Sequence, residues 1–208
     1  RSTLFPYTTL FRSLELVAFA AACAAQGLRT PRQTVVDCSE LAHGDPGIDI
    51  PFPLVGKAAV GSDWDAVEFP GKRKIYFLDT PEELASLWSD LRGAGYASTF
   101  LIQERIPGED EAMRSVTAYM ASNGEMTMIG SARVLLEDHA PTLIGNPVAM
   151  ITEPFPELWD GAERLLGAAG YRGFANFDVK VDPRTGESVF FELNPAPKIG
   201  RASCRERV

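Results

Sequence analysis

Two segments near the end of the chain combine strand-like alternation with acid and amide side chains. Residues 173–181 and 187–193 are predicted strands, and the five residues between them, DPRTG, are turn formers. A turn centred between Arg184 and Gly186 joins the strands as a hairpin. Its register gives two cross-strand pairs on one face: Asp178 with Glu192, and Asn176 with Asn194. The opposite face is predicted to be apolar and to carry Ala175, Phe177, Val179 and Val181 from the first strand and Val189, Phe191 and Leu193 from the second.

This pairing of acids points to a cation site. Two carboxylates that face each other across a hairpin repel, because their Cβ atoms lie only about 5 Å apart. Hard oxygen ligands with no His or Cys beside them suit Mg²⁺, which takes a few protein oxygens together with substrate phosphates. The alternative is a pair of solvated carboxylates on an outer sheet face, and a register slip of one residue would separate them. Spacing alone leaves both interpretations open.

The whole hairpin segment also resembles a known family. Residues 174–195 read FANFDVKVDPRTGESVFFELNP, which resembles the metal-binding segment of the ATP-grasp superfamily. The resemblance implies that Asp178, Glu192 and Asn194 bind Mg²⁺, and that this ion bridges the phosphates of ATP.

Two further segments resemble the same superfamily and occur in the expected order. Residues 52–58, FPLVGKA, resemble the strand whose lysine contacts an ATP phosphate, which implies that role for Lys57. Residues 100–110, FLIQERIPGED, resemble the hinge strand that lines the adenine pocket. In this second segment the resemblance implies base contacts by Gln103, Glu104 and Ile106, and ribose contacts by Asp110.

The resemblance carries expectations about fold and reaction. The superfamily fold is α+β, with two subdomains whose antiparallel sheets sandwich a nucleotide. The segments KRKIYFLDTPEEL, LIQERIPGED, LLEDHAPTLIGN and GYRGFANFDVK are similar to the carboxylate–amine ligases of this superfamily. Such enzymes use ATP and Mg²⁺ to convert a small-molecule carboxylate into an acyl-phosphate, and an amine then displaces the phosphate. We therefore expect an ATP-dependent, C–N bond-forming ligase; the alternatives are a nucleotide-binding module without catalysis and a truncated fragment without function.

Three basic residues are further candidates for the site. Arg114 and Arg133 suit the substrate carboxylate or the acyl-phosphate, because a guanidinium binds such oxygens bidentately, yet either also fits a structural ion pair. Lys74 ends a basic triplet that stands where many relatives have a Gly-rich loop; the triplet either approaches phosphates or forms a solvated turn. Where the superfamily often has an arginine after Glu-x-Asn-Pro, this chain has Ala196.

Apolar spacing predicts the elements that position these residues. Helices are expected from Leu14 to about Leu28, after a capping box at Thr80-Pro81-Glu82-Glu83, and from Phe155 to Ala169. Asn123-Gly124 supplies the positive φ of a hairpin turn. The predicted strands are residues 33–37, 52–59, 100–105, 115–120, 125–133, 173–181 and 187–193. Hairpins therefore outnumber βαβ units, as in an α+β protein.

The same pattern suggests a domain organisation. Residues 14–51 are expected to be the end of a truncated preceding domain and a linker. Residues 52–102 would form the first ATP-grasp subdomain, and residues 103–197 would form the second subdomain with the metal-binding hairpin.

The two ends of the chain are set aside from the fold. Residues 1–13 and 198–208 can be back-translated onto the two strands of one DNA sequence that resembles a sequencing-library adapter. Without them, 184 of the 208 residues remain and the formal net charge falls from −8 to −13. We therefore expect the natural part to be a fragment of a longer enzyme.

Composition excludes several classes of function. A formal net charge of −8 argues against nucleic-acid binding, because phosphate contacts require a basic surface. No run of apolar residues is long enough to span a bilayer, and no basic segment precedes an apolar one in the pattern of a secretory signal. Three scattered cysteines are too few for a disulfide framework or a zinc site. These features predict a cytoplasmic protein.

Overall fold

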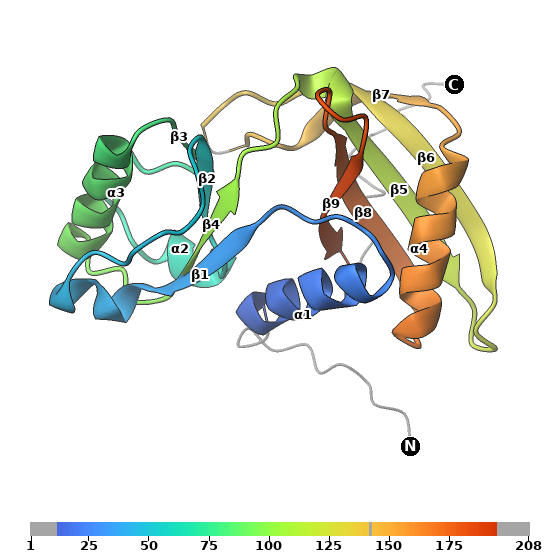
Figure 1. Cartoon of the computed structure of the whole chain (residues 1–208), viewed down its shortest axis with the longest axis horizontal. Coiled ribbons are helices and arrows are strands. Elements are labelled where there is room, and N and C mark those ends of the chain that lie inside the picture. The colour runs from blue at the N-terminus through green and yellow to red at the C-terminus, as the bar shows by residue number, and fades with distance from the viewer. Residues whose placement is uncertain (1–11, 142, 195–208) are drawn as a thin grey trace, which may run out of the picture. The chain divides into compact units, whose positions relative to one another are not determined.

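The computed structural model describes residues 12–141 and 143–194 (Figure 1). The chain divides into two compact units. Among the described residues, unit 1 comprises 12–18, 31–106, 138–141 and 143–146, and unit 2 comprises 19–30, 107–137 and 147–194. The adapter-like ends, apart from Arg12 and Ser13, and the position of Ala196 lie outside the described residues. The domain boundaries expected from the sequence stay a prediction.

Unit 1 is built on a four-stranded antiparallel sheet in the order β1-β4-β2-β3. Its strands are β1 (Gln33–Asp37), β2 (Leu54–Ala58), β3 (Tyr76–Leu78) and β4 (Thr99–Glu104). A short 3-10 helix, Cys38–His43, and the short helix α2 (Gly61–Asp65) connect them.

Helix α3 (Pro81–Gly93) packs against this sheet and closes the core of unit 1. Its capping box is present as the sequence predicts: the Thr80 side chain accepts from the Glu83 amide, and the Glu83 carboxylate accepts from the Thr80 amide. The helix buries an apolar face of Leu84, Leu87, Trp88 and Leu91. A Cβ atom on Gly56 of β2 would meet the Phe100 ring of β4 at 2.9 Å, so glycine leaves the space in which this ring packs.

Unit 2 is built on a five-stranded antiparallel sheet in the order β7-β6-β5-β8-β9. Its strands are β5 (Met113–Met120), β6 (Met126–Glu137), β7 (Pro147–Thr152), β8 (Gly173–Val181) and β9 (Ser188–Asn194). The turn between β5 and β6 contains Gly124 at a φ of +92°, as its Asn-Gly sequence predicts.

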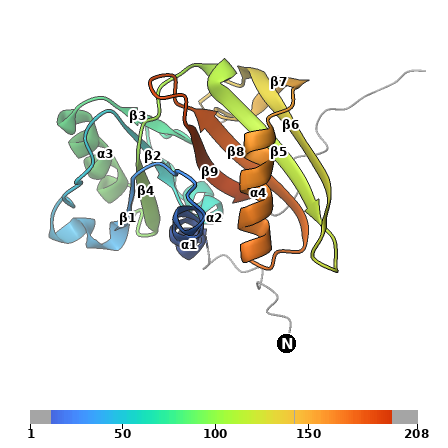
Figure 2. The ribbon, with the colours of Figure 1, turned by 45° about the vertical axis from the view of Figure 1, so that its right-hand side comes forward.

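Helix α4 (Pro156–Ala168) lies along one face of this sheet (Figures 1 and 2). It packs Leu158, Ala162 and Leu166 against Val116 and Phe177, in a core that also includes Cys23 of helix α1 (Arg12–Ala25). Burial raises the pKa of the Cys23 thiol to about 12, so this cysteine is a small apolar core residue rather than a nucleophile. Because α4 covers one face of the sheet, the polar side chains of β8 and β9 lie on the other face.

Most of the predicted elements are present, and both sheets are antiparallel, as the hairpin-rich pattern predicts. Strands β1 and β8 have the predicted bounds, whereas β6 continues four residues further than expected. Strands β3 and β7 were not expected: one has only three residues, and the other follows a loop and forms a sheet edge. None of the helices among the described residues is long and apolar enough to cross a membrane.

Candidate functional site

The hairpin of β8 and β9 places the two acids opposite each other. Asp178 pairs with Glu192 and Asn176 pairs with Asn194, which is the predicted register. A β-bulge between Asp178 and Val179 shifts the register on the loop side, where Val179 pairs with Phe190. The observed turn therefore differs by one position from the expected one, and the bulge restores the predicted pairing of the acids.

Because of the bulge, the side chains of β9 that face the core differ from the predicted ones. Phe191 was expected to point to the apolar side, but it occupies the bulge, and Phe190 is buried in the core instead. The Phe190 ring meets the Phe177 ring edge to face, with centroids 5.9 Å apart. An extra residue on one strand shifts side-chain alternation by one position, so Phe190 and Leu193, three positions apart, both pack in the core.

The acids and Asn194 form one polar cluster. The Asn194 Nδ2 group donates to Asp178 Oδ2 at 3.3 Å and to Glu192 Oε1 at 3.0 Å, so both carboxylates converge on one point. The described residues contain no group of three or more His, Cys, Asp and Glu placed to hold a metal. Two carboxylates and an amide oxygen are nevertheless a hard donor set that fits Mg²⁺ together with oxygens of a substrate.

Asn176 lies beside this cluster and is almost fully buried, with 2% of its surface exposed. Its Nδ2 group donates to Ser115 Oγ and Thr117 Oγ1, each at 2.9 Å, and to the Val116 carbonyl at 3.4 Å. Its Oδ1 atom is buried without a hydrogen-bond partner. The alternation of β8 placed Asn176 on this face, but only the packing shows that its oxygen is unsatisfied.

Arg114 and Arg133 do not join the cluster. They are cross-strand partners on β5 and β6, and strand alternation places them on the face covered by α4, opposite to Asp178. The Arg114 guanidinium lies 4.7 Å from the centre of the Phe155 ring, and Arg133 Nε donates to Glu153 Oε2 at 2.8 Å. These contacts favour the structural alternative for both arginines.

In unit 1, Lys57 of β2 lies on the sheet face away from α3, because Leu54 and Gly56 point into the core. Its cross-strand partner on β4 is Leu101, and the next position on the same face is Gln103. The Gln103 side chain is buried and donates from Nε2 to Gln33 Oε1 at 3.0 Å. The structure thus brings Lys57 and Gln103 to one face of the same sheet.

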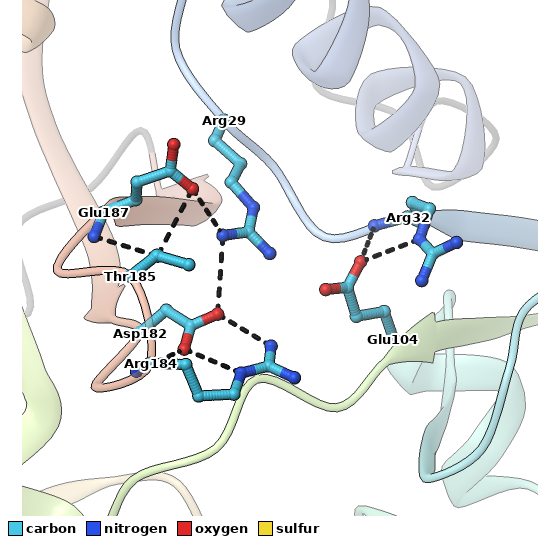
Figure 3. A network of polar contacts seen from close by, with 7 residues as sticks. All are labelled: Arg29, Arg32, Glu104, Asp182, Arg184, Thr185 and Glu187. Carbon is cyan, nitrogen blue, oxygen red and sulfur yellow. Dashed lines mark hydrogen bonds and ion pairs between the residues drawn. The ribbon is translucent and has the colours of Figure 1, made fainter.

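The end of β4 is tied to the start of β1 (Figure 3). Arg32 donates to Glu104 Oε2 from Nε at 3.1 Å and from its backbone amide at 3.2 Å, and the Glu104 amide donates to the Arg32 carbonyl at 2.8 Å. Ile106, two residues further on, is buried. Arg32 is therefore a residue that holds a predicted adenine contact in place, and no local pattern in the sequence signals it.

The remaining candidates make loop contacts. In unit 1, Lys74 Nζ donates to the Ile144 carbonyl at 3.0 Å and to Asn146 Oδ1 at 3.1 Å. In unit 2, Asp110 begins a short 3-10 helix, Asp110–Ala112, and its Oδ2 accepts from the Glu137 amide at 2.9 Å. Both side chains therefore stabilise the loops from which a nucleotide contact would be made.

A second polar network fixes the β8–β9 loop of unit 2 (Figure 3). Arg184 donates to the two carboxylate oxygens of Asp182, from Nε at 3.0 Å and from Nη2 at 2.7 Å. Arg29 bridges the same Asp182 at 3.4 Å and Glu187 at 2.8 Å. Hydrogen bonds from Arg184 hold the pKa of Asp182 well below its usual range, so this buried acid is ionised and structural.

Comparisons with known proteins agree with this architecture. No protein-family model matches the chain. D-aspartate ligase from Enterococcus faecium (strain Aus0004) is 33% identical over 190 residues, which cover 90% of this chain. The chain spans 45% of the length of that relative.

Solved structures show the fold. D-alanine–D-alanine ligase from Bacillus anthracis, complexed with ATP, superimposes with a TM-score of 0.58 at 19% identity, over 92% of this chain and 57% of that one. The biotin carboxylase domain of 2-oxoglutarate carboxylase from Hydrogenobacter thermophilus, in complex with MgADP, gives a TM-score of 0.63 at 15% identity, over 89% of this chain and 40% of that one. The chain is thus a homologue of D-aspartate ligase and has the fold of the ATP-grasp enzymes.

Proposed function

We propose that this chain supplies the ATP- and Mg²⁺-binding part of a ligase that joins a carboxylate to an amine. The observation that carries the proposal is the convergence of the Asp178 and Glu192 carboxylates on the Asn194 side chain. Like charges directly opposite each other destabilise a hairpin unless they serve a cation, and these oxygens suit Mg²⁺. The homology to D-aspartate ligase and the fold shared with ATP- and MgADP-bound enzymes support the same conclusion.

The proposal gives each candidate residue a role. Asp178, Glu192 and Asn194 would hold the ion, which supplies positive charge to the phosphates of ATP. Lys57 would add a second positive charge to the phosphates, with Lys74 as a further candidate. Gln103, Glu104 and Ile106 would contact the adenine, and Asp110 the ribose. Arg32 would position Glu104 through the two hydrogen bonds that it donates.

The reaction has two steps. An oxygen of the substrate carboxylate attacks the γ-phosphorus of ATP, and the bond to ADP breaks, which gives an acyl-phosphate. The amine nitrogen then attacks the acyl carbon and loses a proton, and phosphate leaves with the electrons of the C–O bond. The contribution of the protein to the first step is positional and electrostatic. The relative's name makes D-aspartate the first substrate to test.

Asp178→Asn tests the proposal, because it removes one charge from the hairpin and preserves the shape of the side chain. We expect MgADP binding, measured by calorimetry, to weaken at least about tenfold, since a hydrogen-bonded or coordinating charge contributes about 1.5–3 kcal/mol. Asp160→Asn, on the exposed face of α4, is the matched control and should bind as the wild type does. Equal affinity in Asp178→Asn and the wild type would remove the metal assignment.

A measurement of turnover distinguishes a ligase from a nucleotide-binding module without catalysis. ADP release from ATP is measured with D-aspartate as the carboxylate and a panel of amines. Release that requires both substrates supports the ligase. MgADP binding without ADP release under any pair supports the nucleotide-binding module instead.

A cytoplasmic location is part of the same proposal. The substrate ATP is a cytoplasmic metabolite, and the thiols of Cys23 and Cys38 are free and buried within the described residues.

A further inference from the structure

The orientation of the Asn194 amide is incompatible with a direct metal bond. Its Nδ2 group points between the carboxylates of Asp178 and Glu192, where it donates to both. An amide nitrogen of this kind carries hydrogens and does not ligate Mg²⁺, which binds oxygen. For Asn194 to become a ligand, its amide must rotate by about 180°, a motion about a broad, roughly two-fold torsion.

The rotation creates a need for a new acceptor. Once Oδ1 of Asn194 faces the ion, its Nδ2 group turns away from the carboxylates and requires another oxygen. Asn176 is the cross-strand partner of Asn194 on the same face, so their Cβ atoms are about 4.5–5.5 Å apart. Its Oδ1 atom is buried and has no hydrogen-bond partner.

The Asn176 amide is also held in the orientation that such a contact requires. Ser115 Oγ and Thr117 Oγ1, both on β5, accept from its Nδ2 group at 2.9 Å. Strand β8 lies between β5 and β9, and the two polar atoms of a planar amide point about 120° apart. With the nitrogen directed to β5, the oxygen is directed away from β5, on the side of β9 and Asn194.

We propose that Asn176 is a positioning residue for the metal centre: it accepts a hydrogen bond from Asn194 Nδ2 when that amide rotates to present its oxygen to Mg²⁺. The hairpin then has two states. Without the ion, the Asn194 amide screens the two carboxylates from each other; with the ion, the buried Asn176 oxygen gains the partner that it otherwise lacks. An unsatisfied buried acceptor is costly, so satisfying it favours the metal-bound state.

Binding of the metal is the first test, and it rests on the proposed function only through the presence of a Mg²⁺ site. Asn176→Leu keeps the volume and removes the acceptor. We expect the affinity for Mg²⁺ in the presence of ADP, measured by calorimetry on the whole chain, to fall about 10–100-fold, as when other groups that orient metal ligands are removed. Thr117→Val, which removes one contact that orients Asn176, should cause a smaller loss.

Val116→Ala is the matched stability control. Val116 is buried on β5 but points to the opposite face, into the core under α4. Its substitution should lower the melting temperature and leave the Mg²⁺ affinity unchanged. A loss of affinity in Val116→Ala equal to that in Asn176→Leu would mean that general destabilisation explains the effect, and the proposal would be overturned.

Side-chain amide NMR on the wild type provides a readout that is independent of any variant. Adding Mg²⁺ should shift the Asn194 NH₂ resonances and slow their exchange with solvent, because the group moves from the carboxylates to a buried acceptor. Mg²⁺ binding with unchanged Asn194 resonances, or an Asn176→Leu affinity within twofold of the wild type, overturns this inference and leaves the proposed function intact. A wild-type chain that binds no Mg²⁺ with ADP overturns both.

Discussion

Asp182 shows how one side chain can look catalytic and yet be structural. Its carboxylate is fully buried, and the pKa is strongly lowered, two features that often mark active sites. Its partners explain both features, since Arg184 and Arg29 donate to its oxygens at the tip of the hairpin. The function of this acid is therefore to fix the loop that sets the β8–β9 register.

The pH dependence of stability tests this role. Because the folded-state pKa of Asp182 is lowered, its contribution is fully present above the unfolded pKa, near 3.9, and is lost as pH falls toward the folded value. We expect Asp182→Asn to be less stable than the wild type by a constant amount above about pH 5, and the gap to narrow below pH 4. Urea unfolding across this pH range measures the gap, with Asp160→Asn as the exposed control; a gap independent of pH would contradict the ion-pair explanation.

At the scale of elements, the bulge in β9 decides which side chains join the polar cluster of Asp178, Glu192 and Asn194. The observed turn leaves Val179 opposite Phe190, and the extra residue Phe191 brings Glu192 back opposite Asp178. The same insertion buries Phe190. The hairpin therefore serves the core and the site at once, which a strict two-residue alternation would not allow.

Two alanine variants distinguish the bulged hairpin from a regular one. Phe190→Ala should lower the free energy of unfolding by about 3–5 kcal/mol, because it removes a buried aromatic ring from the core of unit 2. Phe191→Ala should cost much less, since its side chain is only partly buried at the bulge. Chemical denaturation measures both, and a larger loss for Phe191→Ala would show that the regular alternation is the correct one.

At the scale of the whole molecule, metal and nucleotide should act together on stability. A ligand that binds only the folded chain stabilises it, by about 2.7 kcal/mol at a concentration 100 times its Kd. We expect MgADP at that ratio to raise the melting temperature, and EDTA to abolish most of the rise. In Asp178→Asn, MgADP and metal-free ADP should give the same small shift; a full MgADP shift in this variant would place the ion elsewhere.

Local patterns in the sequence determined most of the helices, turns and strands of this protein. The capping box at Thr80, the Asn-Gly turn and the apolar faces of α3 and α4 each depend on residues within a few positions of one another. The pairing of Asp178 with Glu192 was also predictable, because the two strands are joined by a short loop. Helical and strand periodicities encode such features directly.

Only the tertiary structure decided the contacts between distant segments. Arg29 and Asp182 are 153 positions apart, and Arg32 and Glu104 are 72 apart, so no periodicity links them. The separation of Arg114 from the polar cluster depends on which sheet face α4 covers. The orientation that leaves the Asn176 oxygen unsatisfied depends on two hydroxyls of another strand. The sequence by itself determined the facing acids and the hairpin that carries them, because their spacing is local. The tertiary structure decided which side chains contact those residues, because hydrogen bonds and burial arise between strands brought together only by folding.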